Sequence, residues 1–289
     1  MSRGQWEDAR ADHEASRDSR EGPRDGESRQ PETPARDMRQ PVRGGRGDTT
    51  YHLRESEWRT LDTVGTFRVV TETDVMRATG DDRVARADVR HLVESGLADR
   101  KTAIVSHTPT RLVVLTKEGK ALLERHRVSR GRPADQPYYA GFVKPRELAH
   151  DVQLYRAYLA ERARIDADGG RITRVVLDYE LKRDYQAFLN RRDRPQDATV
   201  ESDRQAFAEA RALPIVDGHL ELPDLRLEIE RPDGTHDTRD IEVVTAHYSR
   251  SQLAGKAKAG FALYRVSPGG AGSTRGGTPI DPHNLEWLR

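Results

Sequence analysis

Residues 224–246 contain the pattern that most constrains the fold of this chain. Apolar side chains occupy every second position of residues 225–229 (LRLEI), and charged side chains fill the positions between them. Pro232-Asp233-Gly234 follows, and these are residue types that turns favour. Residues 240–246 then continue as a second apolar-rich segment. Because successive side chains of a strand lie on opposite faces of a sheet, this segment predicts a β-hairpin with a buried face.

The register of the hairpin decides which polar residues lie together. If the apolar positions of residues 225–229 share a face with those of residues 241–245, only pairings of one parity are allowed. That parity places Asp224 and Glu242 near each other on the same face. Two converging carboxylates can hold Mg²⁺ or Mn²⁺, as metal-dependent cleavage of a phosphodiester requires. The alternative is an ordinary polar outer face, since other charged residues of the hairpin share it.

Composition limits the extent of the folded part and the class of the protein. Residues 1–48 are nearly free of aliphatic side chains, which predicts a disordered tail. The 49 Lys and Arg residues nearly balance the 48 Asp and Glu residues, so global charge gives no argument for nucleic acid. The chain has no cysteine and no apolar run near the roughly 18 residues that a membrane span needs. We therefore expect a cytoplasmic protein without a membrane partner.

Residues 51–128 predict a small helical domain with a hairpin. Three helices are expected before Gly96, followed by strands at residues 103–106 and 111–115, a turn at residues 107–110, and a closing helix from Thr116. This order is typical of the winged helix-turn-helix. Residues 129–144, which are basic and contain proline, are expected to form a linker.

The third predicted helix carries a basic stripe formed by Arg83, Arg86 and Arg90. In a winged helix this element usually enters the major groove, where guanidinium groups contact phosphates or guanine edges. Double-stranded DNA is the partner that this stripe predicts. The alternatives are a solvated helix face or a surface that binds another protein.

Residues 145–267 predict a second domain of mixed helices and strands. A helix over residues 145–164 precedes a strand at residues 172–179, two helices at residues 180–190 and 200–212, the hairpin, and a helix at residues 249–264. The glycine-rich residues 268–289 are expected to form a flexible tail. The chain is thus expected to be an α/β (α+β) protein with a winged-helix domain and a second, mixed-sheet domain.

The second domain resembles the core of the PD-(D/E)XK nuclease superfamily, a restriction-endonuclease-like mixed sheet. The resemblance rests on Pro223-Asp224, on the strand Ile241-Glu242-Val243, and on the lysine-bearing helix that follows. With the preceding winged helix, residues 58–266 resemble the replication-relaxation family of actinobacterial plasmid and mobile-element proteins. In that family a histidine-containing helix precedes the core, which His150 matches.

The resemblance implies a catalytic lysine, but Val244 occupies its usual position. Some superfamily members supply this lysine from the next helix, and Lys256 is the first candidate here, with Lys258 as the second and Gln252 as a weaker polar neighbour. The catalytic set implied is Asp224, Glu242 and Lys256. If neither lysine reaches the carboxylates, the domain keeps the fold without the reaction.

Two further carboxylates are weaker candidates. Asp151 lies within the apolar stripe of its helix, where an unpaired charge is unfavourable. Glu180 follows the predicted strand and would add a third metal-binding carboxylate to Asp224 and Glu242, although a glutamate at a helix start is also favoured by the helix dipole. Histidines show no zinc-ligand spacing, so no zinc is predicted.

The function expected from these features is DNA binding in plasmid or mobile-element replication, relaxation or transfer. The second domain is then either an Mg²⁺- or Mn²⁺-dependent endodeoxyribonuclease or a degenerate form of one. The alternative is a winged-helix transcriptional regulator whose C-terminal domain mediates oligomerisation, for example as a homodimer. A third reading is an interaction adaptor that does not contact DNA.

Overall fold

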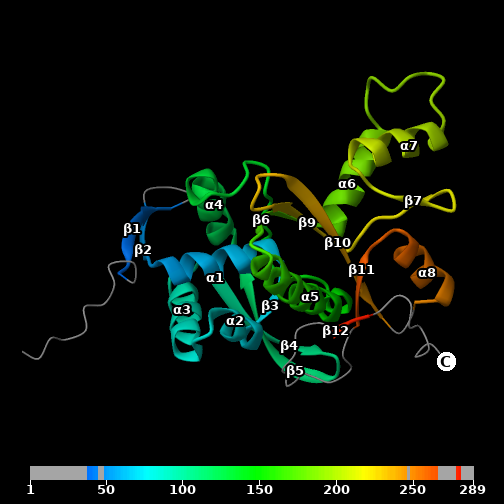
Figure 1. Cartoon of the computed structure of the whole chain (residues 1–289). Coiled ribbons are helices and arrows are strands. Elements are labelled where there is room, and N and C mark those ends of the chain that lie inside the picture. Colours follow the sequence, from blue (N-terminus) through cyan, green and yellow to red (C-terminus); the bar gives the residue numbers. More distant parts are fainter. Residues whose placement is uncertain (1–37, 45–48, 246–247, 266–277, 281–289) are drawn as a thin grey trace, which may run out of the picture. The chain divides into compact units, whose positions relative to one another are not determined.

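The computed structural model describes residues 38–44, 49–245, 248–265 and 278–280, and it shows a mixed α/β protein with several small sheets (Figure 1). Most of the tail expected at residues 1–48 lies outside these ranges. Within it, however, Gln40–Arg43 form strand β1, which pairs antiparallel with β2 (Thr50–Leu53). The prediction of disorder was wrong for this strand, because Val42 packs against the core and Arg39 binds the buried Glu57.

The first half of the described chain has the predicted three helices, hairpin and closing helix, and it adds a short strand, β3, that was not predicted and that pairs with β5. Its helices and strands are α1 (Glu55–Thr66), β3 (Val70–Thr71), α2 (Glu72–Thr79), α3 (Asp82–Glu94), β4 (Ala98–Val105), β5 (Thr108–Leu115) and α4 (Lys117–His126). Helices α2, α3 and α4 begin at side-chain caps from Thr71, Asp81 and Thr116. Their apolar faces meet in a core that includes Leu61, Leu92 and other side chains with no exposed surface.

The hairpin β4–β5 is longer than predicted, and its turn lies elsewhere. The strands pair from Ala98↔Leu115 to Val105↔Thr108, so Ser106 and His107 alone form the turn. Both residues have positive φ, 47° and 67°, as a two-residue hairpin turn requires. The expected turn at residues 107–110 was wrong because the β-branched Thr108 and Thr110 extend the ladder, and no glycine marks the real turn.

The segment at residues 129–144, which was predicted to be a linker, has little regular structure, and parts of it are buried. Gln136 is 1% exposed, and its amide exchanges hydrogen bonds with the backbone of Val175 at 3.1 and 3.2 Å. Tyr138 is also buried and donates to Asp62 at 2.8 Å. This segment therefore contacts both the helical half and the sheet that follows.

The second half is built around a five-stranded sheet with the order β12-β11-β10-β9-β6. Its elements are the 3₁₀ turn η3 (Pro145–Glu147), α5 (Leu148–Ala167), β6 (Arg171–Leu177), α6 (Asp178–Leu189), α7 (Val200–Ala210), β7 (Ile215–Val216), β8 (His219–Leu220), β9 (Leu225–Glu230), β10 (His236–Val244), α8 (Arg250–Lys258), β11 (Ala262–Arg265) and β12 (Thr278–Pro279). Strands β6, β9 and β10 are antiparallel neighbours, whereas β10 and β11 are parallel. Helix α5 packs on β6 and β10.

The predicted helix at residues 249–264 was wrong in its second half. Helix α8 ends at Lys258, Gly260 adopts φ +79°, and Ala262–Arg265 form β11 beside β10. A short apolar run does not distinguish a helix from a buried strand. Residues 262–265 form a strand here because their backbone pairs with the otherwise open edge of β10. Since parallel neighbours need a crossover, α8 is the connection that carries the chain back to the start of β11.

A short strand lies within the segment that was expected to be a flexible C-terminal tail. Most of residues 268–289 lie outside the described ranges, but Thr278–Pro279 form β12, which pairs with β11. No helix within the described ranges is both long enough and apolar enough to cross a membrane.

Candidate active site

The carboxylates of Asp224 and Glu242 lie side by side where β9 begins and β10 approaches its end. Leu225 pairs with Ile241, which is the parity that the sequence requires. The Asp224 amide donates to Glu242 Oε2 at 3.2 Å, and the Val243 amide donates to Asp224 Oδ2 at 2.9 Å. The sheet backbone therefore fixes the positions of both carboxylates.

Lys256 of α8 reaches this pair. Its Nζ lies 3.2 Å from Glu242 Oε1 and 3.2 Å from Glu221 Oε2, and it donates to the Leu222 carbonyl at 2.8 Å. Val244, at the usual lysine position, is 3% exposed and packs with Leu253 in an apolar cluster. The structure thus brings Lys256 to the carboxylates from the following helix.

The other two candidates in α8 do not reach the carboxylates. Lys258 is 60% exposed and pairs with Asp217 at 3.0 Å. Gln252 caps the start of α8 by accepting from the Ser249 amide at 2.9 Å. Both have local roles at opposite ends of the helix.

His150 contacts Asp224 from α5. Its Nε2 lies 3.2 Å from Asp224 Oδ2, and its Nδ1 lies 3.7 Å from Asp151 Oδ1. Burial lowers the pKa of His150, but hydrogen bonds and charges from Asp151 and Asp224 outweigh it and raise the pKa to about 10. We therefore expect an imidazolium that balances the charge of Asp224 at neutral pH.

The unusual position of Asp151 is explained by a long-range partner. Asp151 is 4% exposed, and its Oδ2 lies 3.4 Å from Nε of Arg68, a residue between α1 and β3. Arg68 also donates to Glu147 at 2.6 Å and has a positive φ of 61°. Arg68, Asp151 and His150 thus form a chain of charged contacts from the helical half to Asp224.

Glu180 does not join the pair. It is 1% exposed and accepts from the Leu177 amide at 3.2 Å and from Tyr139 OH at 2.9 Å. Burial raises its pKa to about 7, although the Leu177 amide and the charge of Arg174 oppose this. Its contacts are those of a buried helix cap.

Three residues near the pair carried no sequence signal. Tyr248 donates to Glu242 Oε1 at 2.6 Å, and Glu221 shares Lys256. Lys182 pairs with Asp178 at 2.7 Å; burial lowers the pKa of Lys182, but this hydrogen bond and the charges of Asp178, Asp224 and Glu242 outweigh burial and raise the pKa. No motif spacing marks these residues, because separate loops and α6 bring them to the sheet.

Burial and like charge set the protonation of Glu242. Its side chain is 3% exposed. Burial first, and then the charge of Asp224, raise its pKa to about 7, while Lys256 and the Tyr248 hydroxyl lower it. A carboxylate that changes protonation near neutral pH is a frequent feature of functional sites.

The donor set suits a hard, hydrated cation. Mg²⁺ in proteins is often held by one or two carboxylates and keeps several waters, and Asp224 and Glu242 could supply such carboxylates. Asp224 remains 14% exposed, so one side of the pair is open. Among the residues that the structure describes, no group of three or more Asp, Glu or His side chains is placed so that it could hold a metal ion.

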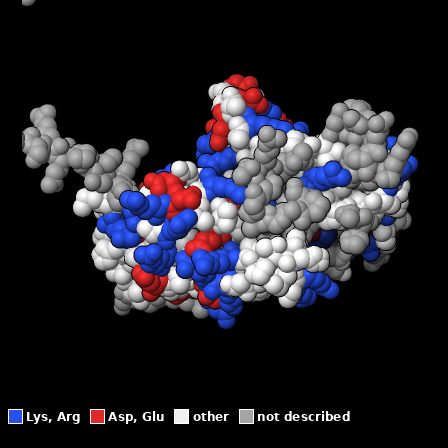
Figure 2. Space-filling view, turned by 90° about the horizontal axis from the view of Figure 1, so that it is seen from below, with Lys and Arg blue, Asp and Glu red and all other residues white. Residues whose placement is uncertain are grey.

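The three arginines of the predicted DNA-binding stripe are exposed on α3. Arg86 pairs weakly with Asp82 at 3.4 Å, and the described part of the chain offers no ion pair to Arg83 or Arg90. Asp88, which could have diluted the stripe, is fully buried on the opposite side. Figure 2 shows Lys and Arg side chains gathered, with interspersed Asp and Glu, on the face seen from below in Figure 1.

Comparison of the chain with protein-family models, with curated proteins and with solved structures gives no match. The functional argument therefore rests on the geometry of this chain.

Proposed function

We propose that this chain is a DNA-binding protein whose Asp224, Glu242 and Lys256 form a site for Mg²⁺- or Mn²⁺-dependent cleavage of a phosphodiester. The observation that carries the proposal is the position of Lys256, whose Nζ lies 3.2 Å from Glu242 although it comes from a different element. Two carboxylates at the ends of the neighbouring strands β9 and β10, with an ammonium group from α8 beside them, are groups that such a reaction can use.

Each residue has a distinct role in the proposal. Asp224 and Glu242 would hold the cation, which when bound supplies Lewis-acid stabilisation of charge on the scissile phosphate. Lys256 would stabilise the same developing charge or orient the attacking water. His150 would keep Asp224 in place, since its imidazolium contacts Asp224 Oδ2 at 3.2 Å.

The order of elements supports the same proposal. Helix α5, strands β6, β9 and β10, helix α8 and strand β11 follow one another as in the nuclease-like core that the sequence resembles, with α6, α7 and the β7–β8 hairpin inserted after β6. The four helices and the hairpin of residues 55–126 support the proposal of a winged helix-turn-helix, in which α3 would present Arg83, Arg86 and Arg90 to DNA. A role in plasmid or mobile-element replication, relaxation or transfer is part of the proposal through this resemblance.

A second function is favoured by the charge balance of the site. His150 and Lys256 already compensate Asp224 and Glu242, and Val244 replaces the usual lysine. A chain that had lost cleavage would keep this arrangement as a structural network. It would then act as a DNA-binding regulator whose C-terminal half mediates oligomerisation.

The test is nicking of supercoiled plasmid DNA by the purified chain with and without Mg²⁺ or Mn²⁺, beside Asp224→Asn. The proposal predicts metal-dependent nicking that the variant loses, while Asp217→Asn, at a 73% exposed carboxylate, keeps it. DNA binding without nicking by any of the three proteins would favour the regulator. Equal nicking by all three would refute the assignment of the site.

A further inference from the structure

A basic pocket lies away from the candidate active site. It has a volume of about 200 Å³ and is lined by residues of α1, of α4 and the segment after it, and of β6. Five arginines line it: Arg59, Arg127, Arg130, Arg132 and Arg171. None of the three proposed catalytic residues lines the pocket, so the following argument does not rest on the proposed function.

Two of these arginines are neutralised by the two carboxylates in the lining. Arg132 Nε lies 3.1 and 3.2 Å from the oxygens of Asp62, which also accepts from Tyr138 OH at 2.8 Å. Arg130 binds Glu55 at 2.6 Å, and its guanidinium lies 5.0 Å from the centre of the Trp58 ring. These contacts hold the two guanidinium groups in fixed orientations.

The other three arginines have no carboxylate partner within the lining. Arg171 pairs with Glu230, which is outside the lining. Arg127 donates to the Gln136 carbonyl at 2.7 Å, and its buried Nε has no hydrogen-bond partner in the described part of the chain. For Arg59, the residues that the structure describes supply no carboxylate. With five arginines and two carboxylates, the lining has a formal charge of +3, and Glu230 outside the lining compensates one of these charges by pairing with Arg171.

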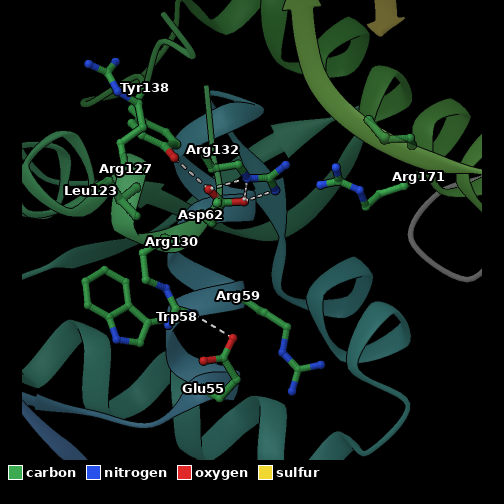
Figure 3. Close-up of a pocket in the computed structure, with 12 residues that line it drawn as sticks. Glu55, Trp58, Arg59, Asp62, Leu123, Arg127, Arg130, Arg132, Tyr138 and Arg171 are labelled. Atoms are coloured by element: carbon green, nitrogen blue, oxygen red, sulfur yellow. Dashed lines mark hydrogen bonds and ion pairs between the residues drawn. The ribbon is translucent and has the colours of Figure 1, made fainter. Parts of the chain in front are cut away.

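The arrangement of the guanidinium groups favours one kind of ligand. In Figure 3, the guanidinium of Arg171 points from β6 toward that of Arg132, whereas Arg130 turns toward Glu55 and Trp58 and the guanidinium of Arg59 points away from the Arg132–Arg171 pair. Like charges that face one another across a cavity are stabilised by an anion between them. A guanidinium group can bind two phosphate oxygens at once. The cavity is smaller than pockets for drug-sized ligands, so it suits a small anion.

We propose that this pocket binds a phosphate-bearing anion, either a free phosphate compound such as pyrophosphate or the 5′-phosphate at the end of a nucleic acid. Both sources share the chemistry that the arginines recognise. The anion would bridge Arg132 and Arg171, and the other arginines of the lining would add positive charge around it.

Trp58 gives the experiment a local reporter. The chain has three tryptophans, Trp6, Trp58 and Trp287, so the full-length Trp6→Phe/Trp287→Phe variant leaves Trp58 as the only one. Its emission should respond when an anion binds in the pocket, because the Trp58 ring is part of the lining. In this background we would titrate inorganic pyrophosphate, and then short oligonucleotides with either a 5′-phosphate or a 5′-hydroxyl, with calorimetry in parallel.

The variants separate a built site from general attraction to positive charge. Arg171→Gln and Arg59→Gln remove guanidinium groups from exposed side chains, so the fold should remain. Each is expected to weaken binding at least about tenfold, as loss of a charged hydrogen-bond partner does. Arg183→Gln, at a 63% exposed arginine of α6 outside the pocket, makes the same change of charge and should bind like the parent.

Two results would support the site, and they identify the source of the phosphate. Saturable 1:1 binding of pyrophosphate, weakened by both pocket variants, indicates a free phosphate compound. Preference for the 5′-phosphorylated oligonucleotide over its 5′-hydroxyl form, weakened by the same variants without comparable pyrophosphate binding, indicates a nucleic-acid end. Absence of binding for all probes, or an equal loss in Arg183→Gln, would overturn the proposal.

Discussion

Glu242→Gln should make the protein more stable above neutral pH, although it removes a residue of the candidate site. The Glu242 side chain is 3% exposed and lies beside Asp224. Burial and this neighbouring charge raise its pKa from 4.5 to about 7. Since the folded chain binds this proton more tightly than the unfolded chain, ionisation of Glu242 opposes folding.

The size of the effect follows from the pKa. A tenfold change in a protonation equilibrium corresponds to about 1.4 kcal/mol, so the rise from 4.5 to about 7 corresponds to on the order of 3 kcal/mol. This stabilisation is complete below pH 4.5 and is lost as the pH rises through about 7. Glutamine keeps the shape and does not ionise, so the variant should exceed the parent by about 2–3 kcal/mol at pH 8 and by little at pH 5.

Urea unfolding followed by circular dichroism at pH 5 and pH 8 measures the difference. Glu57→Gln is the matched control because Glu57 is also fully buried. Burial raises the pKa of Glu57, but Arg39, the Arg54 amide and His91 outweigh it, so the pKa is lowered. This control should therefore lose stability at pH 8. The reasoning would be refuted if the Glu242→Gln protein were less stable than the parent at pH 8, or if its free energy of unfolding differed from that of the parent by the same amount at pH 5 and pH 8.

Three further predictions concern single contacts. Arg90→Gln should weaken DNA binding and lower the slope of log affinity against log salt by about one in an anisotropy titration, because one phosphate contact is lost; an unchanged slope would contradict this. Asp151→Asn should lower the pKa of His150 from about 10, as measured by NMR. The stabilisation that protonated His150 contributes is present in full below pH 6.5, and in the variant it should be lost at a lower pH than in the parent. An unchanged titration of His150 would show that Asp151 does not hold the proton. Tyr248→Phe removes a hydrogen bond that lowers the pKa of Glu242, so this pKa should rise further, and a fall would be inconsistent with the contact.

The parts of the fold that the sequence predicts are those with a strong local period. The alternation at residues 225–229 allows only one parity, and the observed pairing Leu225↔Ile241 follows from it. Capped helices such as α2 and α3 are equally local, since Thr71 and Asp81 mark their first turns. In both cases the signal lies within a few residues of the element.

The errors come from features that only distant segments decide. Ala262–Arg265 form a strand because β10 offers an unpaired edge, which no local pattern reveals. The turn at Ser106–His107 lacks the glycine that usually marks positive φ. Tyr248 and the contact between Arg68 and Asp151 were missed for a related reason, because tertiary packing brings these groups together.

Comparison of Lys256→Gln with Lys258→Gln in a metal-dependent plasmid-nicking assay tests the central claim most directly. Both changes remove one lysine from α8, but only Lys256 contacts Glu242. The proposed function predicts that Lys256→Gln lowers the nicking rate by about 100-fold or more, as expected for loss of a group that stabilises the transition state, and that Lys258→Gln nicks like the parent. Equal nicking rates for the two variants would contradict the claim that Lys256 completes the active site.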